Sequence, residues 1–171
     1  MKDSRLPISF TRDGLAAAGF EGFQSVRDLR GTKLADVPCG RGVYVVLWPE
    51  PGLPGFRKVS AGGWFKCQDP SDPISGLREA WIDGAQALYL GRAAGASGGR
   101  GDLRMRIGKL LAFGAGLPID HRGGRYLWQL VRSENLVVCW KVVPDPKAVE
   151  SRLINQFERT YGRLPFANLR R

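Results

Sequence analysis

Apolar residues along the chain concentrate in three short runs of β-branched and aromatic side chains. The runs cover residues 41–48 (RGVYVVLW), 86–91 (QALYLG) and 135–143 (NLVVCWKVV). Runs of this length, bounded by proline or glycine, are typical of buried strands. The chain therefore predicts a small antiparallel sheet of three strands.

Helical periodicity and capping residues predict two longer helices around these strands. Asp102 is a suitable N-cap for residues 103–113, in which leucine and isoleucine recur at helical spacing. A second helix begins after Asp145, with Pro146 at its first position and Gly162 just past its end. Together with the strands, these helices indicate an α+β fold, a three-stranded antiparallel sheet flanked by helices.

The N-terminal residues predict short helices. Thr11 and Ser25 are suitable caps for two of them. We therefore expect residues 1–40 to form a helical appendage packed on one domain, residues 41–171.

The first two predicted strands are separated by an insertion, residues 49–85. It opens with a loop rich in proline and glycine, and Ser75 is a suitable cap for a helix later in it. Residues 125–131 (RYLWQLV) fit either a short helix or a strand.

The charge balance points to a polyanionic partner. The chain has 26 lysines and arginines against 16 acidic residues, a net charge of +10, and 19 of the 26 are arginine. The planar guanidinium suits bidentate phosphate contacts, and clustered basic residues are typical of nucleic-acid-binding domains. A basic protein without such a partner is the alternative. The basic residues cluster between positions 92 and 132 (Arg92, Arg100, Arg104, Arg106, Lys109, Arg122, Arg125 and Arg132) and near the C-terminus (Arg159, Arg163, Arg170 and Arg171).

Composition also bears on the compartment. The chain has no run of about 18 apolar residues, and its start lacks the apolar segment of a secretion signal. Cys39, Cys67 and Cys139 have neither metal-ligand spacing nor the pattern of a disulfide framework. We therefore expect a cytoplasmic protein with reduced thiols and no membrane partner.

Glu150 occupies an unusual position in the last predicted helix. It falls in the middle of the apolar stripe that contains Val149, Leu153 and Phe157. An ionised glutamate on a buried face is costly unless it is paired or binds a metal. Either Glu150 stays hydrated in the first turn and interacts with the helix dipole, or it is a metal ligand at the floor of a cleft.

Five motifs occur in an order that resembles the GIY-YIG nuclease superfamily. They are GVY (42–44), YLG (89–91), LRMRI (103–107), VESRLINQF (149–157) and PFAN (165–168). The resemblance covers about residues 41–171 and lies in the ordered set, because either tripeptide alone is a chance match. It implies a DNA endonuclease that hydrolyses phosphodiester bonds with a divalent metal ion, Mg²⁺ or Mn²⁺.

The resemblance implies a metal ligand and a phosphate clamp. Glu150 would hold the metal, and Arg106 would clamp the scissile phosphate. Helical periodicity places Arg104 and Arg106 on opposite flanks and does not choose between them. Arg106 is preferred because it fits the L-x-x-R-φ pattern of the family.

The remaining implied roles belong to three polar side chains. Tyr44 resembles the family tyrosine that helps to deprotonate the attacking water, which requires a lowered pKa. Tyr89 would position water or phosphate, and Asn168 would orient a neighbour or the phosphate.

The chain departs from the family pattern in two places. Tyr44 and Tyr89 are 45 residues apart because of the insertion, and the family residue one turn after the arginine is here Leu110. His121, the only histidine, is therefore a candidate catalytic acid or base. The residues expected to bind substrate are Gly42, Gly91, Arg92, Arg104, Lys109, Arg122 and Arg125.

The sequence thus predicts a metal-dependent endonuclease that acts on DNA. A catalytically weak or inactive nucleic-acid-binding module on the same fold is the alternative, and Leu110 favours it. An enzyme of unrelated chemistry on this fold is a third possibility. The sequence does not choose between a monomer and a homodimer.

Overall fold

The fold is built on a four-stranded antiparallel sheet in the order β1-β4-β2-β3. It is seen in a computed structural model, which describes residues 7–95 and 101–169. Arg100, Arg170 and Arg171 of the predicted basic clusters lie outside the described residues. The strands are β1 (Glu21–Ser25), β2 (Gly42–Leu47), β3 (Ala87–Ala93) and β4 (Val137–Val142).

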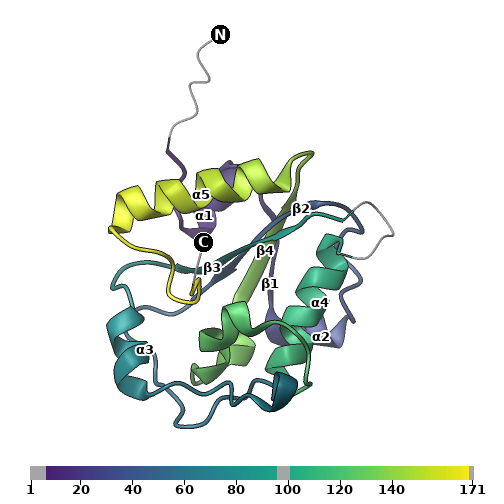
Figure 1. The fold of residues 1–171 in the computed structure, drawn as a ribbon. Coiled ribbons are helices and arrows are strands. Elements are labelled where there is room, and N and C mark those ends of the chain that lie inside the picture. Colours follow the sequence, from purple (N-terminus) through teal and green to yellow (C-terminus); the bar gives the residue numbers. More distant parts are fainter. Residues whose placement is uncertain (1–6, 96–100, 170–171) are drawn as a thin grey trace.

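Helices cover both faces of the sheet (Figure 1). One face carries α1 and α5, and the other carries α2 and α4. Among the described residues, α3 and the 3₁₀ segments η1, η2 and η3 lie on the same side as α4. The bounds are α1 (Arg12–Ala17), α2 (Val26–Gly31), α3 (Ile74–Ala80), α4 (Leu103–Gly114), α5 (Pro146–Tyr161), η1 (Phe65–Cys67), η2 (Arg122–Gln129) and η3 (Ser133–Asn135).

The prediction of three strands was wrong, because β1 adds a fourth at the edge beside β4. The segment EGFQS is short and polar and shows no apolar alternation, so it carries no strand pattern. Its ladder is irregular between Glu21 and Gln24, where Gly22 and Phe23 have positive φ angles. The N-terminal region therefore contains a sheet strand as well as helices.

Local capping signals were confirmed for the two long helices. The Asp102 side chain accepts a hydrogen bond from the Met105 backbone N–H (2.8 Å), and Asp145 caps α5 in the same way. Gly162 ends α5 in the left-handed conformation. Ser75 is not a cap, because α3 already begins at Ile74. Residues 122–129 form a 3₁₀ helix, so the short helix, and not the strand, is the correct one of the two alternatives for residues 125–131.

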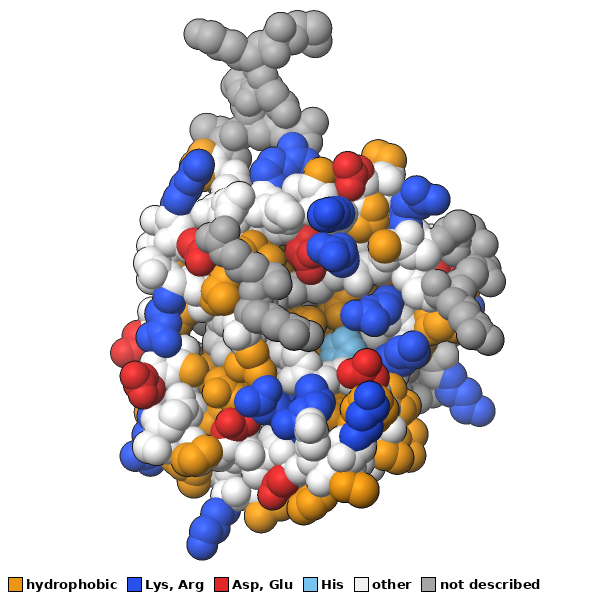
Figure 2. Space-filling view, viewed as in Figure 1, with side chains coloured by type: hydrophobic (Ala, Val, Ile, Leu, Met, Phe, Trp, Pro, Cys, Tyr) orange, Lys and Arg blue, Asp and Glu red, His pale blue; other side chains and the backbone are white. Residues whose placement is uncertain are grey.

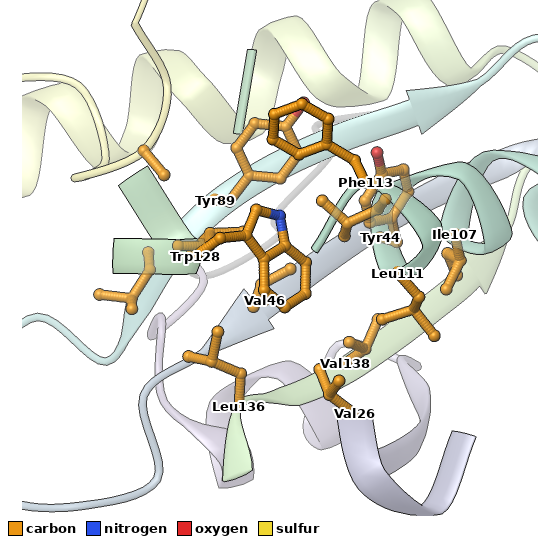
Figure 3. Close-up of a cluster of buried hydrophobic side chains, with 14 of the residues drawn as sticks. Val26, Tyr44, Val46, Tyr89, Ile107, Leu111, Phe113, Trp128, Leu136 and Val138 are labelled. Atoms are coloured by element: carbon orange, nitrogen blue, oxygen red, sulfur yellow. The ribbon is translucent and has the colours of Figure 1, made fainter. Parts of the chain in front are cut away.

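Alternation along β2 divides the core into two clusters. Val43, Val45 and Leu47 face α1 and α5, whereas Tyr44 and Val46 face α4. Figure 3 shows the cluster on the α4 side of the sheet, in which Tyr44 and Tyr89 lie among large apolar side chains such as Trp128. Both signature tyrosines therefore emerge on the same face of the sheet.

The insertion is fastened to η2 by a buried amide. Gln129 is fully buried, and its Nε2 donates to the carbonyl oxygens of Arg57 (3.1 Å) and Asp72 (2.8 Å). Its Oε1 accepts from the Asp72 backbone N–H (2.7 Å). An isolated bridge between Phe56 and Leu130 adds a second connection. The insertion thus packs against the layer that holds α4.

The described part of the chain has no helix with the length and apolarity needed to cross a membrane.

Candidate active site

A cleft of about 360 Å³ runs along the edge strand β3. One wall comes from α4 and the residues at the start of η2, and the other comes from α5. A larger cavity of about 1160 Å³ lies between α1 and α5, but its lining contains none of the predicted site residues. The residues that line the cleft are Tyr89, Leu90, Gly91, Arg92, Arg106, Asp120, His121, Arg122, Gly123, Glu150, Ile154, Asn168 and Leu169.

The cleft brings together most of the residues singled out by the motifs, although they come from opposite faces of the sheet. Arg106 approaches from the α4 side and Glu150 from the α5 side, with Tyr89 on the strand between them. Figure 2 shows acidic and basic side chains around the chain's one histidine on this face. Three guanidinium groups and two carboxylates line the cleft, which gives it a net positive charge.

Glu150 faces the cleft and is mostly removed from water. Its side chain is only 16% exposed, and its Oε2 accepts a hydrogen bond from Nη1 of Arg92 in an ion pair. It is the fifth residue of α5, and the first turn of that helix contains no acidic residue. The interpretation of a hydrated first-turn carboxylate was therefore wrong.

The two arginines of α4 have different surroundings. Arg104 donates to the carbonyl oxygens of Val37 (2.8 Å) and Ala35 (3.2 Å), so its guanidinium anchors the segment before β2. Arg106 lines the cleft, and its buried Nε has no hydrogen-bond partner in the described part of the chain. The structure therefore does not support the expectation that Arg104 contacts substrate.

Tyr44 lies beneath the cleft, packed against Gly91. The two residues are direct partners in the β2–β3 ladder. A Cβ at Gly91 would lie 2.6 Å from the Tyr44 hydroxyl oxygen, closer than real Cβ atoms approach. The glycine of the second tripeptide therefore makes room for the tyrosine of the first.

Both signature tyrosines are held in their protonated form. Burial raises the pKa of Tyr44 well above its usual value, the neighbouring Tyr89 adds to this, and Arg106 partly offsets it. Burial also raises the pKa of Tyr89, with Tyr44 and Arg106 as smaller opposing influences. The lowered pKa expected for Tyr44 is therefore absent, and both hydroxyls are suited to donate hydrogen bonds near neutral pH.

His121 is buried at the cleft wall and uncharged at neutral pH. Burial lowers its pKa to about 4, and the positive charges of Arg106 and Lys109 act in the same direction. The ring lies edge-on to Tyr89, with 6.2 Å between the ring centroids. Its buried Nε2 has no hydrogen-bond partner among residues 7–95 and 101–169. A neutral imidazole in this position can accept a proton from a bound group.

Asn168 is a positioning residue for β3. Its Nδ2 donates to the Leu90 carbonyl (2.9 Å), and its Oδ1 accepts from the Leu90 backbone N–H (2.9 Å). Ala167 extends this pairing with a bond to the Leu88 carbonyl (2.8 Å). The amide thus orients a neighbour, one of the two roles expected of it, and fixes the strand that carries Tyr89.

The remaining predicted substrate residues divide into two groups. Arg92, Arg122 and Gly91 line the cleft. Outside the lining lie Gly42, Lys109 and Arg125. Arg125 forms an ion pair with Asp72 (2.6 Å), Lys109 is exposed near His121, and Gly42 packs against Leu103 and the Lys141 carbonyl.

Sequence reasoning missed two features of the cleft. Asp120 lines it beside His121, and its only sequence signal was its place in the same turn. The pairing of Arg92 with Glu150 joins residues 58 positions apart, so no local pattern could reveal it. The cleft thus has a second carboxylate and an internal ion pair.

The donor set of the cleft fits a magnesium ion held largely by water and substrate. Within the described residues, no group of three or more His, Cys, Asp or Glu side chains could hold a metal ion. Mg²⁺ often binds through one or two carboxylates together with waters and substrate phosphates. The mostly buried Glu150 carboxylate matches that mode, and Arg92 competes for it.

Comparisons with protein-family models, curated proteins and solved structures give no match for this chain. The resemblance to the GIY-YIG superfamily therefore rests on the motif residues alone, and the function that it implies is a proposal.

Proposed function

We propose that the protein is a divalent-metal-dependent endonuclease that hydrolyses phosphodiester bonds in DNA at the cleft along β3. The observation that carries this proposal is a group of buried polar atoms without partners in the described residues. Arg106 Nε and His121 Nε2 belong to residues that line this cleft. Buried polar atoms normally have hydrogen-bond partners, so two unpaired atoms at one place favour a polar ligand.

The charge of the cleft favours an anionic ligand. Arg106 and Arg122 present guanidinium groups, which bind phosphate oxygens with charge-assisted hydrogen bonds. Arg92 can serve the same purpose once it leaves Glu150. The +10 net charge of the chain supplies the longer-range attraction that polyanions require.

Glu150, together with water and phosphate oxygens, would hold the metal. The ion, Mg²⁺ or Mn²⁺, supplies stabilisation of the negative charge that develops on the phosphate and the leaving oxygen. Arg92 forms an ion pair with Glu150 in the free protein, so a metal ion must compete with this guanidinium for the carboxylate.

Proton transfer falls to His121 more readily than to the tyrosines. The raised pKa values of Tyr44 and Tyr89 keep both phenols protonated, so they donate hydrogen bonds to water or phosphate. His121 is neutral at physiological pH, and its Nε2 faces no partner in the described residues. A pKa of about 4 makes the imidazole a weak base in the free protein, and the negative charge of a bound phosphate would raise that pKa toward the range that suits proton transfer from water. His121 thus takes the function that the family places elsewhere and that Leu110 cannot perform.

A metal-titrated cleavage assay on supercoiled plasmid tests this proposal. We expect nicking with Mg²⁺ or Mn²⁺ and none in EDTA. Salt-dependent binding without nicking under any divalent ion favours the second candidate, a binding module on this fold, which Leu110 supports. Absence of salt-dependent binding contradicts both.

We place this activity in the cytoplasm, where thiols stay reduced. Cys39, Cys67 and Cys139 are all free thiols in the fold.

A further inference from the structure

The insertion presents one exposed tryptophan. Trp64 is 57% exposed, whereas Trp48, Trp81, Trp128 and Trp140 are at most 9% exposed. A tryptophan left in water gives up the free energy that its burial would provide, and exposed aromatic side chains are typical of binding surfaces. Trp64 is therefore a candidate contact residue outside the cleft.

The segment that carries Trp64 is bonded to α4 and to a residue of the cleft wall. The preceding residue, Gly63, donates from its backbone N–H to the Phe113 carbonyl at the end of α4 (2.9 Å). A few residues later, Arg122 donates to the carbonyl oxygens of Gln68 (3.2 Å) and Asp69 (3.3 Å). Figure 1 shows this part of the insertion next to the C-terminal end of α4. A cleft-lining arginine thus fixes the segment that carries Trp64.

The backbone after Trp64 is held in an unfavourable conformation. Lys66 and Cys67 have φ angles of 51° and 57°, in the left-handed region that non-glycine residues seldom occupy. The turn brings the Lys66 ammonium 5.3 Å from the centroid of the Phe65 ring. Phe65 is therefore covered by its own neighbour, and Trp64 remains open to a partner.

The charges around Trp64 suit a polyanion. Lys66 is exposed on the same turn. Arg122, which donates to carbonyl oxygens of this segment, also lines the cleft. Of the nearby acids, Asp72 pairs with Arg125, whereas Asp69, which accepts from the Ser71 backbone N–H (2.8 Å), is exposed and keeps its negative charge. An aromatic face beside a basic groove is the arrangement that binds single-stranded nucleic acid, because bases stack while the backbone follows the positive charge.

We propose that Trp64 stacks on an unpaired base of a nucleic-acid strand whose backbone lies in the cleft. The preferred substrate is therefore single-stranded or locally unpaired, as at a branch, flap or loop, and the insertion is the element that selects it. This proposal rests on the proposed function, since it assumes that the strand occupies the β3 cleft.

The test is a fluorescence titration in EDTA with three oligonucleotides of about 15 nucleotides or base pairs. They are a single strand, a blunt duplex of the same sequence, and a single strand with abasic sites throughout. Because Trp64 is the one exposed tryptophan, we expect the single strand to quench emission strongly and the other two to quench it weakly. Trp64→Ala should lower affinity for the single strand about tenfold and leave the affinity for the abasic strand unchanged. Leu53→Ala, which changes another side chain of the insertion that is 57% exposed, is the matched control and should bind like the wild type.

Two results overturn the proposal in distinguishable ways. If the Trp64→Ala variant binds the single strand as tightly as the wild type, stacking is wrong, while the cleft can still bind nucleic acid. If none of the three oligonucleotides binds in a salt-dependent manner, the proposed function fails and the stacking proposal fails with it.

Discussion

Replacing Arg92 with glutamine should change metal binding and nucleic-acid binding in opposite directions. Arg92 pairs with Glu150 and lines the same cleft. In the free protein its guanidinium is paired with the Glu150 carboxylate, the group that would bind the metal. With a strand bound, the same group is available to a phosphate oxygen. Arg92→Gln therefore frees Glu150 and removes one phosphate contact.

The burial of the pair sets the size of both effects. The Arg92 side chain is 42% exposed and the Glu150 side chain 16%, so solvent screens the interaction in part. An ion pair of this kind is worth about 1 kcal/mol after screening, and removing a positive charge beside a divalent ion contributes a similar amount. Together these amount to about 2 kcal/mol, so we expect Mn²⁺ to bind the free variant roughly thirtyfold more tightly. The slope of log K for DNA binding against log salt concentration should fall in magnitude by about 1, which corresponds to one lost phosphate contact.

Electron paramagnetic resonance of free Mn²⁺ measures the first effect, and duplex or single-strand binding at several salt concentrations measures the second. Arg122→Gln is the matched control, because Arg122 lines the cleft but donates to Gln68 and Asp69. It should weaken DNA binding and leave Mn²⁺ affinity unchanged. Unaltered Mn²⁺ affinity in Arg92→Gln, or equal Mn²⁺ binding by a variant without the Glu150 carboxylate, refutes the reasoning.

Three further predictions test the architecture. Gly91→Ala should lower the free energy of unfolding by about 1–3 kcal/mol, because its Cβ would clash with buried Tyr44, and denaturant unfolding measures this. Gly76→Ala in α3 meets no atom within 4 Å and should instead raise it by up to about 1 kcal/mol; two effects of the same sign would contradict the β2–β3 packing. His121 has a pKa of about 4 in the fold, below its unfolded value, so the unfolded chain takes up the proton first and stability falls as the pH drops through about 6.5. The wild type should lose about 2 kcal/mol between pH 7 and pH 5 that a His121→Leu variant does not lose, and equal losses in the two proteins would show that the histidine titrates normally. Arg104→Ala should lower the melting temperature while cleavage by the folded variant persists, because Arg104 holds carbonyl oxygens outside the cleft; loss of cleavage without loss of stability would place it in the site.

The sequence predicted the parts of the fold that local patterns encode. Three strands have dense apolar runs, and α4 and α5 carry capping residues that act within one turn, as Asp102 does. The position of Glu150 on an apolar stripe correctly pointed to a carboxylate in a partly buried place. These signals depend on neighbours within a few residues, so they are readable without the tertiary structure.

The parts that the sequence did not predict depend on contacts between distant residues. β1 is a polar edge strand that exists because β4 offers it a partner. The role of Arg104 is set by the carbonyl oxygens of Val37 and Ala35. The raised pKa of Tyr44 comes from burial by side chains of several elements. Burial and long-range pairing decided each case, and neither has a local signature.

The most direct test of the proposed function is plasmid cleavage by Glu150→Gln, which removes the carboxylate charge and keeps the shape of the side chain. Glu134→Gln is the matched control, because Glu134 pairs with Arg27 (3.7 Å) and does not line the cleft. We expect Glu150→Gln to bind DNA at least as well as the wild type, since Arg92 is released, and to show no Mg²⁺-dependent nicking. Full nicking by Glu150→Gln, at the rate of the wild type and of Glu134→Gln, would contradict the assignment of the β3 cleft as a metal-dependent nuclease site.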